Sequence, residues 1–165
     1  MLGVFKINFS IYPNAPHRAG KGSAYLGGVH EPMMVYWPGV TEGGTTDGQR
    51  VMIEDFFPTI LEMAGITQYE TRQTIDGVSF VPALRSDSIS ERDIVWHFPN
   101  LWGETQDTEE GYGAYSAIMK GDYHLIYTWE TGRLRLYNVK NDIGEQNDIA
   151  ADNPEVVKTM ATELS

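Results

Sequence analysis

The most constraining feature of this 165-residue sequence is a change in its hydrophobic pattern near the middle. Before the change, residues 32–38 form a short, almost wholly apolar run bounded by prolines, which is typical of a strand buried on both faces of a parallel sheet. After it, residues 115–120 and 123–129 flank a Gly-Asp pair at 121–122, which is a two-residue hairpin signal. Because one buried strand cannot form a parallel sheet alone, we expect the first half to lack its neighbouring strands.

Three further elements follow from local patterns. Apolar residues recur at helical spacing from Ile53 to Ala64, and Gly65 stands at the natural C′ position, so a helix is predicted there. Residues 93–98 and 133–137 are strand-like, and they extend the hairpin into an antiparallel sheet. A final helix is predicted to be capped by Asn153 and opened by Pro154, which would pack one apolar face on that sheet.

The predicted fold class is therefore α/β, followed by a small α+β part. Residues 1–85 are expected to be the remnant of a large α/β domain, with one strand and one helix of its sheet. Residues 86–165 are expected to form a small antiparallel-sheet subdomain with a C-terminal helix.

Composition excludes several classes of function. The net charge of −11, from 23 acidic and 12 basic side chains, would repel nucleic acid and anionic membranes. There is no cysteine, so disulfides, thiolate metal sites and a cysteine nucleophile are excluded within this chain. No apolar run approaches the ~18 residues of a membrane span, and the first residues lack the pattern of a signal peptide. An anion bound by this protein must therefore be held locally, by a few placed cations or backbone N–H groups.

Residues 20–39, GKGSAYLGGVHEPMMVYWPG, closely resemble the second signature of the sulfatase family, G-K-G-[ST]-x-Y-E-G-G-[IV]-R-x-P followed by an apolar strand and W-P-G. The preceding loop at 14–18 is also similar. Later parts of the chain resemble, in order, the family's D-x-x-P-T-[IL]-L-x-x-A-G helix, its D-G-x-S-[FL] segment and its closing sheet, at residues 55–65, 76–80, 116–123 and 136–145. Such a series implies the carboxy-terminal part of an alkaline-phosphatase-like fold.

The resemblance implies one catalytic residue in this chain. Lys21 matches the family lysine that contacts the sulfate and the leaving oxygen, and a cation there would stabilise charge that develops in the transition state. The glycines on both sides of Lys21 let the backbone approach a ligand closely. Without the family match, a lone loop lysine would be read as solvated and inert.

The other catalytic parts of the family are missing from the sequence. The signature C/S-x-P-S/A-R, whose first residue becomes formylglycine, does not occur, nor does the paired-aspartate motif near the family's start. The resemblance therefore implies Ca²⁺ (or Mg²⁺) and formylglycine in the full-length protein, and no metal ligand in this segment. We expect the chain alone to be catalytically silent.

Two further groups of residues are candidates for substrate binding, one close to Lys21 in the sequence and one after the strand at 93–98. His17 and Arg18 lie near Lys21 in sequence and are predicted at the same mouth, with an ordinary surface loop as the alternative. His30 and Leu26 stand where the family usually has Arg and Glu, so a polar pair is replaced by a less polar one.

His97, Asn100 and Trp102 follow the strand at 93–98, in a region where related enzymes shape the substrate pocket. An aromatic side chain beside polar groups suits a sugar or aryl ring. In the alternative reading, the aromatic neighbours of His97 face the core while His97 itself faces solvent or a backbone carbonyl.

The hypothesis is thus a sulfatase segment that provides Lys21 and pocket walls for a sulfated small molecule or glycan. A phosphate-ester hydrolase or transferase of the same superfamily, and a non-catalytic orphan fragment, remain alternatives. The isolated chain is expected to self-associate through its exposed sheet edge. The sequence indicates no compartment for this chain, while the resemblance implies a periplasmic or secreted full-length relative.

Overall fold

The computed structural model describes residues 14–101 and 107–165. The described residues form two compact units: residues 32–91 form one, and residues 14–31, 92–101 and 107–165 together form the other. We call the first the helical unit and the second the sheet unit. In the part of the chain that is described, no helix has the length and apolar character needed to cross a bilayer.

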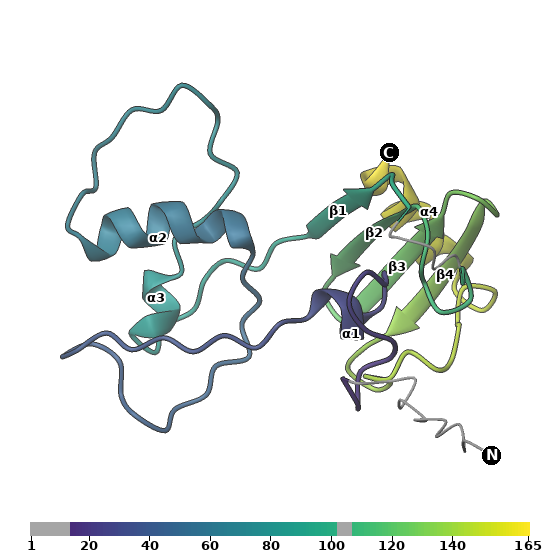
Figure 1. Cartoon of the computed structure of the whole chain (residues 1–165), viewed down its shortest axis with the longest axis horizontal. Helices are drawn as coiled ribbons and strands as arrows, with labels where there is room; N and C mark the ends of the chain where they lie inside the picture. The colour runs from purple at the N-terminus through teal and green to yellow at the C-terminus, as the bar shows by residue number, and fades with distance from the viewer. Residues whose placement is uncertain (1–13, 102–106) are drawn as a thin grey trace, which may run out of the picture. The chain divides into compact units, whose positions relative to one another are not determined.

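Four antiparallel strands in chain order make up the sheet of the sheet unit (Figure 1). They are β1 (Ile94–Phe98), β2 (Tyr115–Lys120), β3 (Tyr123–Thr128) and β4 (Arg133–Asn138). This confirms the predicted meander and its union with the strand near 93–98. At the first hairpin, Gly121 has φ of +53°, a conformation that glycine adopts without steric cost.

One face of this sheet packs against α4 (Pro154–Leu164). The core between them consists of side chains that are essentially inaccessible to solvent: Ile118, Leu125, Leu136 and Met160. Burying an aliphatic side chain of this size contributes about 1.5–3 kcal/mol, so these four residues anchor the helix.

The start of α4 differs from its prediction in one detail. Asn153 is the N-cap residue, and its carbonyl accepts the N–H of Val157 at 3.1 Å. Its side chain does not cap the helix, because Nδ2 donates to the carbonyl of Ile149 at 2.9 Å instead. The side-chain cap predicted for Asn153 was therefore wrong: the amide stabilises the preceding turn.

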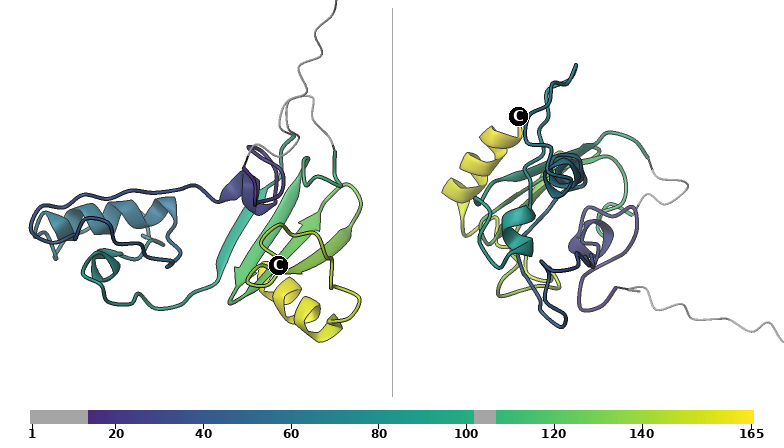
Figure 2. Two further views of the ribbon diagram at one scale, coloured as in Figure 1. Left: turned by 90° about the horizontal axis from the view of Figure 1, so that it is seen from below. Right: turned by 90° about the vertical axis from the view of Figure 1, so that its left-hand side faces the viewer.

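The opposite face of the sheet is covered by α1 (Leu26–Val29) and by the loop at 107–114. Figure 2 shows α1 and α4 on opposite sides of the sheet. Tyr25 and Tyr137 meet on the α1 side, with ring centroids 5.7 Å apart in an edge-to-face arrangement. The sheet therefore separates two environments, an aliphatic one under α4 and a polar, aromatic one under α1.

The helical unit contains η1 (Ile53–Asp55), α2 (Phe56–Met63) and α3 (Val81–Leu84). The predicted helix is confirmed, with its first turn in the 3₁₀ form. Gly65 has φ of +77°, its N–H donates to Glu62 at 2.9 Å, and the next N–H, of Ile66, donates to Leu61 at 2.9 Å. This is the double hydrogen bond of a Schellman C-cap.

Asp55 and Thr59 explain why the helix motif and the later D-G-x-S segment belong together. The Asp55 side chain is buried, and its two carboxylate oxygens accept the N–H groups of Met52 at 2.7 Å and Val78 at 2.8 Å. The Thr59 hydroxyl accepts the N–H of Phe80 at 3.0 Å. Two side chains at the start of the helix thus bind the backbone of a segment about twenty residues later.

Residues 32–38 do not form the buried strand that their apolar pattern predicts. This stretch makes no strand pairing, and Met34 and Tyr36 are 99% and 83% exposed. A strand requires a neighbouring strand for both its hydrogen bonds and its burial. All four strands that the structure describes lie in the sheet unit, so this run has no sheet of its own to enter.

The two units also differ from the expected division at residue 85. Residues 14–31 belong with the C-terminal sheet, whereas the helical unit ends at Glu91. The reason is a set of long-range contacts: Arg18 with Glu110, and Leu26 with Glu145. The apolar pattern of residues 32–64 carries no sign of these contacts.

Candidate functional site

The candidate site centres on the lysine segment, which we define as residues 17–30. Lys21 is exposed at its turn, between Gly20 and Gly22, and Gly22 has φ of +92°. The residues that follow Lys21 are buried, from Ser23 to Gly27. The Lys21 side chain therefore faces solvent, whereas the residues that follow it are enclosed by protein.

Two glycines allow the lysine segment to fold back on itself. A Cβ atom on Gly27 would lie 2.2 Å from the carbonyl oxygen of Arg18, and one on Gly28 would lie 2.1 Å from that of Ser23. Real Cβ atoms do not approach backbone so closely, so only glycine fits at either position. The Gly27 N–H uses the space to donate to Arg18 O at 2.9 Å.

Ser23 attaches the segment to the loop at 107–114. Its fully buried hydroxyl donates to the carbonyl of Glu110 at 2.7 Å and accepts the N–H of Tyr25 at 3.2 Å. The neighbouring Ala24 N–H donates to the carbonyl of Gly111 at 2.9 Å. The serine or threonine of the sulfatase signature thus has a clear structural task in this chain.

Tyr25 continues this attachment toward the sheet. Its hydroxyl donates to the carbonyl of Glu109 at 3.0 Å and lies 3.3 Å from the hydroxyl of Tyr137. Because the single proton of Tyr25 goes to the carbonyl, Tyr137 donates to Tyr25. Burial raises the pKa of both phenols, and the bond that Tyr137 donates raises its pKa further.

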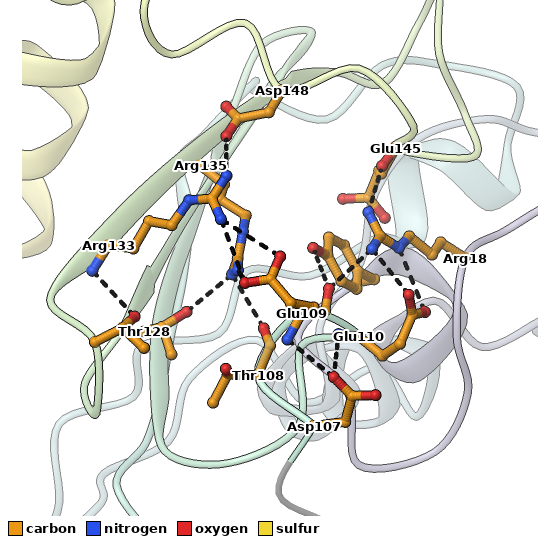
Figure 3. Close-up of polar contacts among 12 residues, drawn as sticks. Arg18, Asp107, Thr108, Glu109, Glu110, Thr128, Arg133, Arg135, Glu145 and Asp148 are labelled. Carbon is orange, nitrogen blue, oxygen red and sulfur yellow. Dashed lines mark hydrogen bonds and ion pairs between the residues drawn. The ribbon is translucent and has the colours of Figure 1, made fainter.

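Arg18 is enclosed in a network of acceptors (Figure 3). Its guanidinium pairs with the Glu110 carboxylate at 3.0 Å and donates to the carbonyls of Glu109 at 2.8 Å and Glu145 at 3.0 Å. It also stacks 4.2 Å from the centroid of the Tyr25 ring. Burial opposes its charge, but the hydrogen bond to Glu110 and the electrostatic interactions with Glu110, Tyr25 and Tyr137 together outweigh it, so the pKa of Arg18 is raised. The guanidinium binds protein on several sides, and this geometry favours a structural role over the predicted substrate contact.

A second arginine network holds the loop at 107–110 from the sheet side (Figure 3). The buried Arg135 donates to Thr108 O at 3.1 Å and to Thr128 Oγ1 at 3.2 Å, and it pairs with Glu109 at 2.8 Å. Arg133 on the same strand adds a more exposed pair with Glu109 at 3.3 Å. The loop that supports the lysine segment is therefore itself fixed by β3 and β4.

His17 and His30 form a second feature of the lysine segment. Nε2 of His17 lies 3.1 Å from Nδ1 of His30, and the ring centroids are 4.8 Å apart. Nε2 of His17 is therefore already occupied by the contact with His30. The sequence drew attention to His30 only as a departure from the family's arginine.

His97 lies elsewhere in the sheet unit. It stands on β1 opposite Ser116, on the α4 side of the sheet, whereas the lysine segment covers the other side. Its Nδ1 is 2.7 Å from Ser116 Oγ, which also accepts the indole N–H of Trp129 at 3.0 Å. The structure therefore does not bring His97 together with Lys21, and it groups His97 with the exposed side chain of Trp129.

The remaining predicted contacts can be placed only in part. Asn100 is exposed just beyond β1. Trp102 lies outside the described residues. No cluster of three or more metal-binding side chains occurs within residues 14–101 and 107–165.

Comparison with known proteins supplies the family. A model of the family described as N-sulphoglucosamine sulphohydrolase, C-terminal, matches residues 21–165. The chain belongs to this family. It is a sulfatase C-terminal segment, and Lys21 is the first residue of the matched region.

Curated relatives agree with this assignment. A sulfatase of Formosa agariphila is 34% identical over 146 residues, covering 86% of this chain and 26% of the relative. The uncharacterized sulfatase YdeN of Escherichia coli K12 is 28% identical over 173 residues, covering 89% of this chain and 30% of the relative. The sulfatase C-terminal segment thus spans between a quarter and a third of the length of these relatives.

Solved structures give the same picture. The crystal structure of Ps i-CgsB in complex with k-i-k-neocarrahexaose has a TM-score of 0.72 and 26% sequence identity, covering 91% of this chain and 31% of that one. The segment therefore has the carboxy-terminal architecture of the alkaline-phosphatase-like fold, as the resemblance implied.

Proposed function

We propose that this chain is the carboxy-terminal segment of an enzyme that hydrolyses sulfate esters, and that Lys21 binds the sulfuryl group. The observation that carries the proposal is the combination of an exposed lysine and a buried, internally bonded backbone in the segment that matches the sulfatase signature. A flexible surface lysine would not need Ser23, Tyr25 and Leu26 to be enclosed.

The chemistry assigned to Lys21 is electrostatic. Cleavage of a sulfate ester places negative charge on the sulfuryl oxygens and on the leaving oxygen, and an ammonium group aimed at them stabilises the transition state. In this role the Lys21 side chain donates hydrogen bonds to these oxygens. The rest of the protein would provide the nucleophile, as hydrated formylglycine, and a divalent metal, Ca²⁺ or Mg²⁺, that holds the sulfate.

The proposed substrate class is a sulfated small molecule or glycan. Support comes from the relative Ps i-CgsB, whose structure contains k-i-k-neocarrahexaose and covers most of this chain. The exposed ring of Trp129, whose indole N–H is directed to Ser116, offers an apolar face of the kind that stacks on sugar rings. This ring lies with His97 on the α4 side of the sheet, away from the lysine segment, so it is not part of the contact proposed for the sulfuryl group.

Hydrolysis of an aryl sulfate tests this function. The assay compares the chain alone, the protein extended through its preceding reading frame, and Lys21→Ala and Lys140→Ala in the extended protein. Lys140 is the matched control, because it is an exposed lysine whose ion pair with Asp122 is 3.3 Å long. We expect turnover only in the extended protein, and loss of it only with Lys21→Ala.

Other outcomes of this assay have definite meanings. Turnover of phosphate esters in place of sulfate esters would instead assign the protein as a phosphate-ester hydrolase or transferase of the same superfamily. An extended protein that cleaves neither ester, or the absence of any preceding reading frame, would leave a non-catalytic fragment and overturn the proposal.

A further inference from the structure

Glu145 contacts the lysine segment although it lies more than one hundred residues later in the sequence. It is the last residue of the stretch that resembles the family's closing-sheet motif, L-Y-[DN]-L-x-x-D-x-x-E. Its side chain is fully buried, and its φ of +50° is unusual for a residue other than glycine. A buried carboxylate on a strained backbone calls for an explanation.

The carboxylate of Glu145 completes the hydrogen bonding of α1. Leu26 is the first residue of this short helix, so its N–H has no acceptor within the helix. Oε2 of Glu145 accepts that N–H at 2.6 Å. The other oxygen, Oε1, lies 2.6 Å from Nδ1 of His124 on β3, which is also fully buried.

The backbone of Glu145 holds the other end of the same segment. Its carbonyl accepts Nη1 of Arg18 at 3.0 Å, as Figure 3 shows. Arg18 precedes Lys21 by three residues and Leu26 follows it by five. Glu145 therefore binds the lysine segment on both sides of Lys21. Its contact with His124 connects the segment to the sheet.

We propose that Glu145 is a positioning residue that fixes Lys21 against the substrate's sulfuryl group. This inference rests on the function proposed above. It assigns a role to the last residue of the closing-sheet motif, whose sequence position alone does not connect it with the site. The rival explanation is that Glu145 only stabilises the fold.

Three substitutions separate positioning from stability. Glu145→Gln keeps one oxygen for Leu26, and its amide can donate to His124 if the imidazole takes the other tautomer. Glu145→Asp keeps the charge but is one methylene too short for both contacts. Glu145→Leu removes both contacts and leaves the Leu26 N–H and His124 Nδ1 buried without partners.

The experiment measures kcat and KM of the extended enzyme on an aryl sulfate, per folded molecule, for these variants. We expect Glu145→Leu and Glu145→Asp to lower kcat/KM about 100-fold, mostly through kcat, because misplacement of about 1 Å costs this much. Glu145→Gln should stay within about threefold of the parent enzyme. Deuterium uptake in residues 17–30 should rise in Glu145→Leu and Glu145→Asp only.

The control for stability is Thr59→Ala in the helical unit. It removes the hydroxyl that accepts the Phe80 N–H, and so destabilises the protein without touching the lysine segment. It should keep kcat/KM per folded molecule within about threefold. The inference is overturned if Glu145→Asp, and Glu145→Leu where it folds, match Thr59→Ala. If Lys21→Ala itself leaves kcat/KM unchanged, the proposed function fails instead.

Discussion

Arg18 and Glu110 lie 92 residues apart in the chain and form a two-point contact, with Nη2–Oε1 at 3.0 Å and Nε–Oε2 at 3.5 Å. The two side chains are 15% and 25% exposed, so water screens this pair only in part. The same guanidinium reaches the carbonyls of Glu109 and Glu145. A single arginine therefore joins the lysine segment, its supporting loop and the turn after β4.

Removal of this arginine should destabilise the sheet unit. Arg18→Ala leaves the Glu110 carboxylate and two carbonyls without their donor, and we expect a loss of about 2–3 kcal/mol in the free energy of unfolding. Lys140→Ala removes only an exposed pair with Asp122 and should change it by less than about 0.5 kcal/mol. Urea unfolding of the isolated chain measures both, and equal effects would contradict the network.

The two glycines after Tyr25 give a prediction about packing. In Gly27→Ala the new methyl group would meet the Arg18 carbonyl, and the segment must move, at a cost of about 1–3 kcal/mol. Gly48→Ala is the matched control, because a Cβ atom there meets nothing within 4 Å. Thermal unfolding of the two variants should show a lower midpoint for Gly27→Ala alone. A normal midpoint for that variant would show that the backbone can yield.

The buried phenols predict a loss of stability in alkali. Burial raises the pKa of Tyr25 and Tyr137, so the folded state holds these protons more tightly than the unfolded state. Their contribution is complete below the unfolded pKa of about 10 and is lost as the pH rises above it. Urea midpoints should therefore fall between about pH 9 and pH 11.5.

The control for this effect is substitution by phenylalanine. The double variant Tyr25→Phe with Tyr137→Phe has no buried phenol at this place, so its urea midpoint should depend less on pH over the same range. Tyr36→Phe, at a ring that is 83% exposed, should retain the pH dependence of the parent chain. An unchanged slope in the double variant would assign the alkaline transition to other groups.

The elements predicted correctly are those whose signals are local. The hairpin at Gly121, the C-cap at Gly65 and the start of α4 at Pro154 each depend on a few neighbouring residues, and each is confirmed. The strand predicted at 32–38 depends on partners elsewhere, and without them the run is extended and exposed.

The candidate site shows the same division. Lys21 was found because glycines and a serine surround it in a recognisable order. Glu110 and His124 support its segment from distant positions, and no local pattern marks them. Glu145 ends a recognisable motif, but the motif does not connect it with Lys21. Arg18 was noticed for its charge, but only the fold shows that its guanidinium is directed into the protein.

Asp55 provides a prediction for the helical unit. Asp55→Ala removes the acceptors of two N–H groups, those of Met52 and Val78, and should release the segment that follows α2. We expect faster proteolysis within residues 66–78 and a loss of about 2–4 kcal/mol, because two buried donors lose their partner. Glu54→Ala, at an exposed neighbouring side chain, is the control. Equal proteolysis of the two variants would refute this role for Asp55.

The apolar surface of the helical unit predicts self-association of the isolated chain. On α2 and the turn before it, Ile53 and Ile60 are 77% and 58% exposed, although they belong to the apolar stripe that defines the helix. Met34 and Tyr36 add further exposed apolar area. Surfaces of this kind on a folded unit normally face another protein surface. We therefore expect concentration-dependent dimers and dye binding.

Sedimentation velocity and 8-anilinonaphthalene-1-sulfonate fluorescence measure this association. The double variant Ile53→Ser with Ile60→Ser should shift the chain toward monomer and lower the fluorescence, because it removes apolar surface that only a second protein surface would cover. Ile143→Ser in the sheet unit is the control, at a side chain that is 46% exposed but lies outside this surface. If Ile143→Ser changed association and fluorescence as much as the double variant, the contact would be assigned to the sheet unit. The edge strands β1 and β4 would then be the next candidates. A monomer without dye binding at every concentration would contradict self-association altogether.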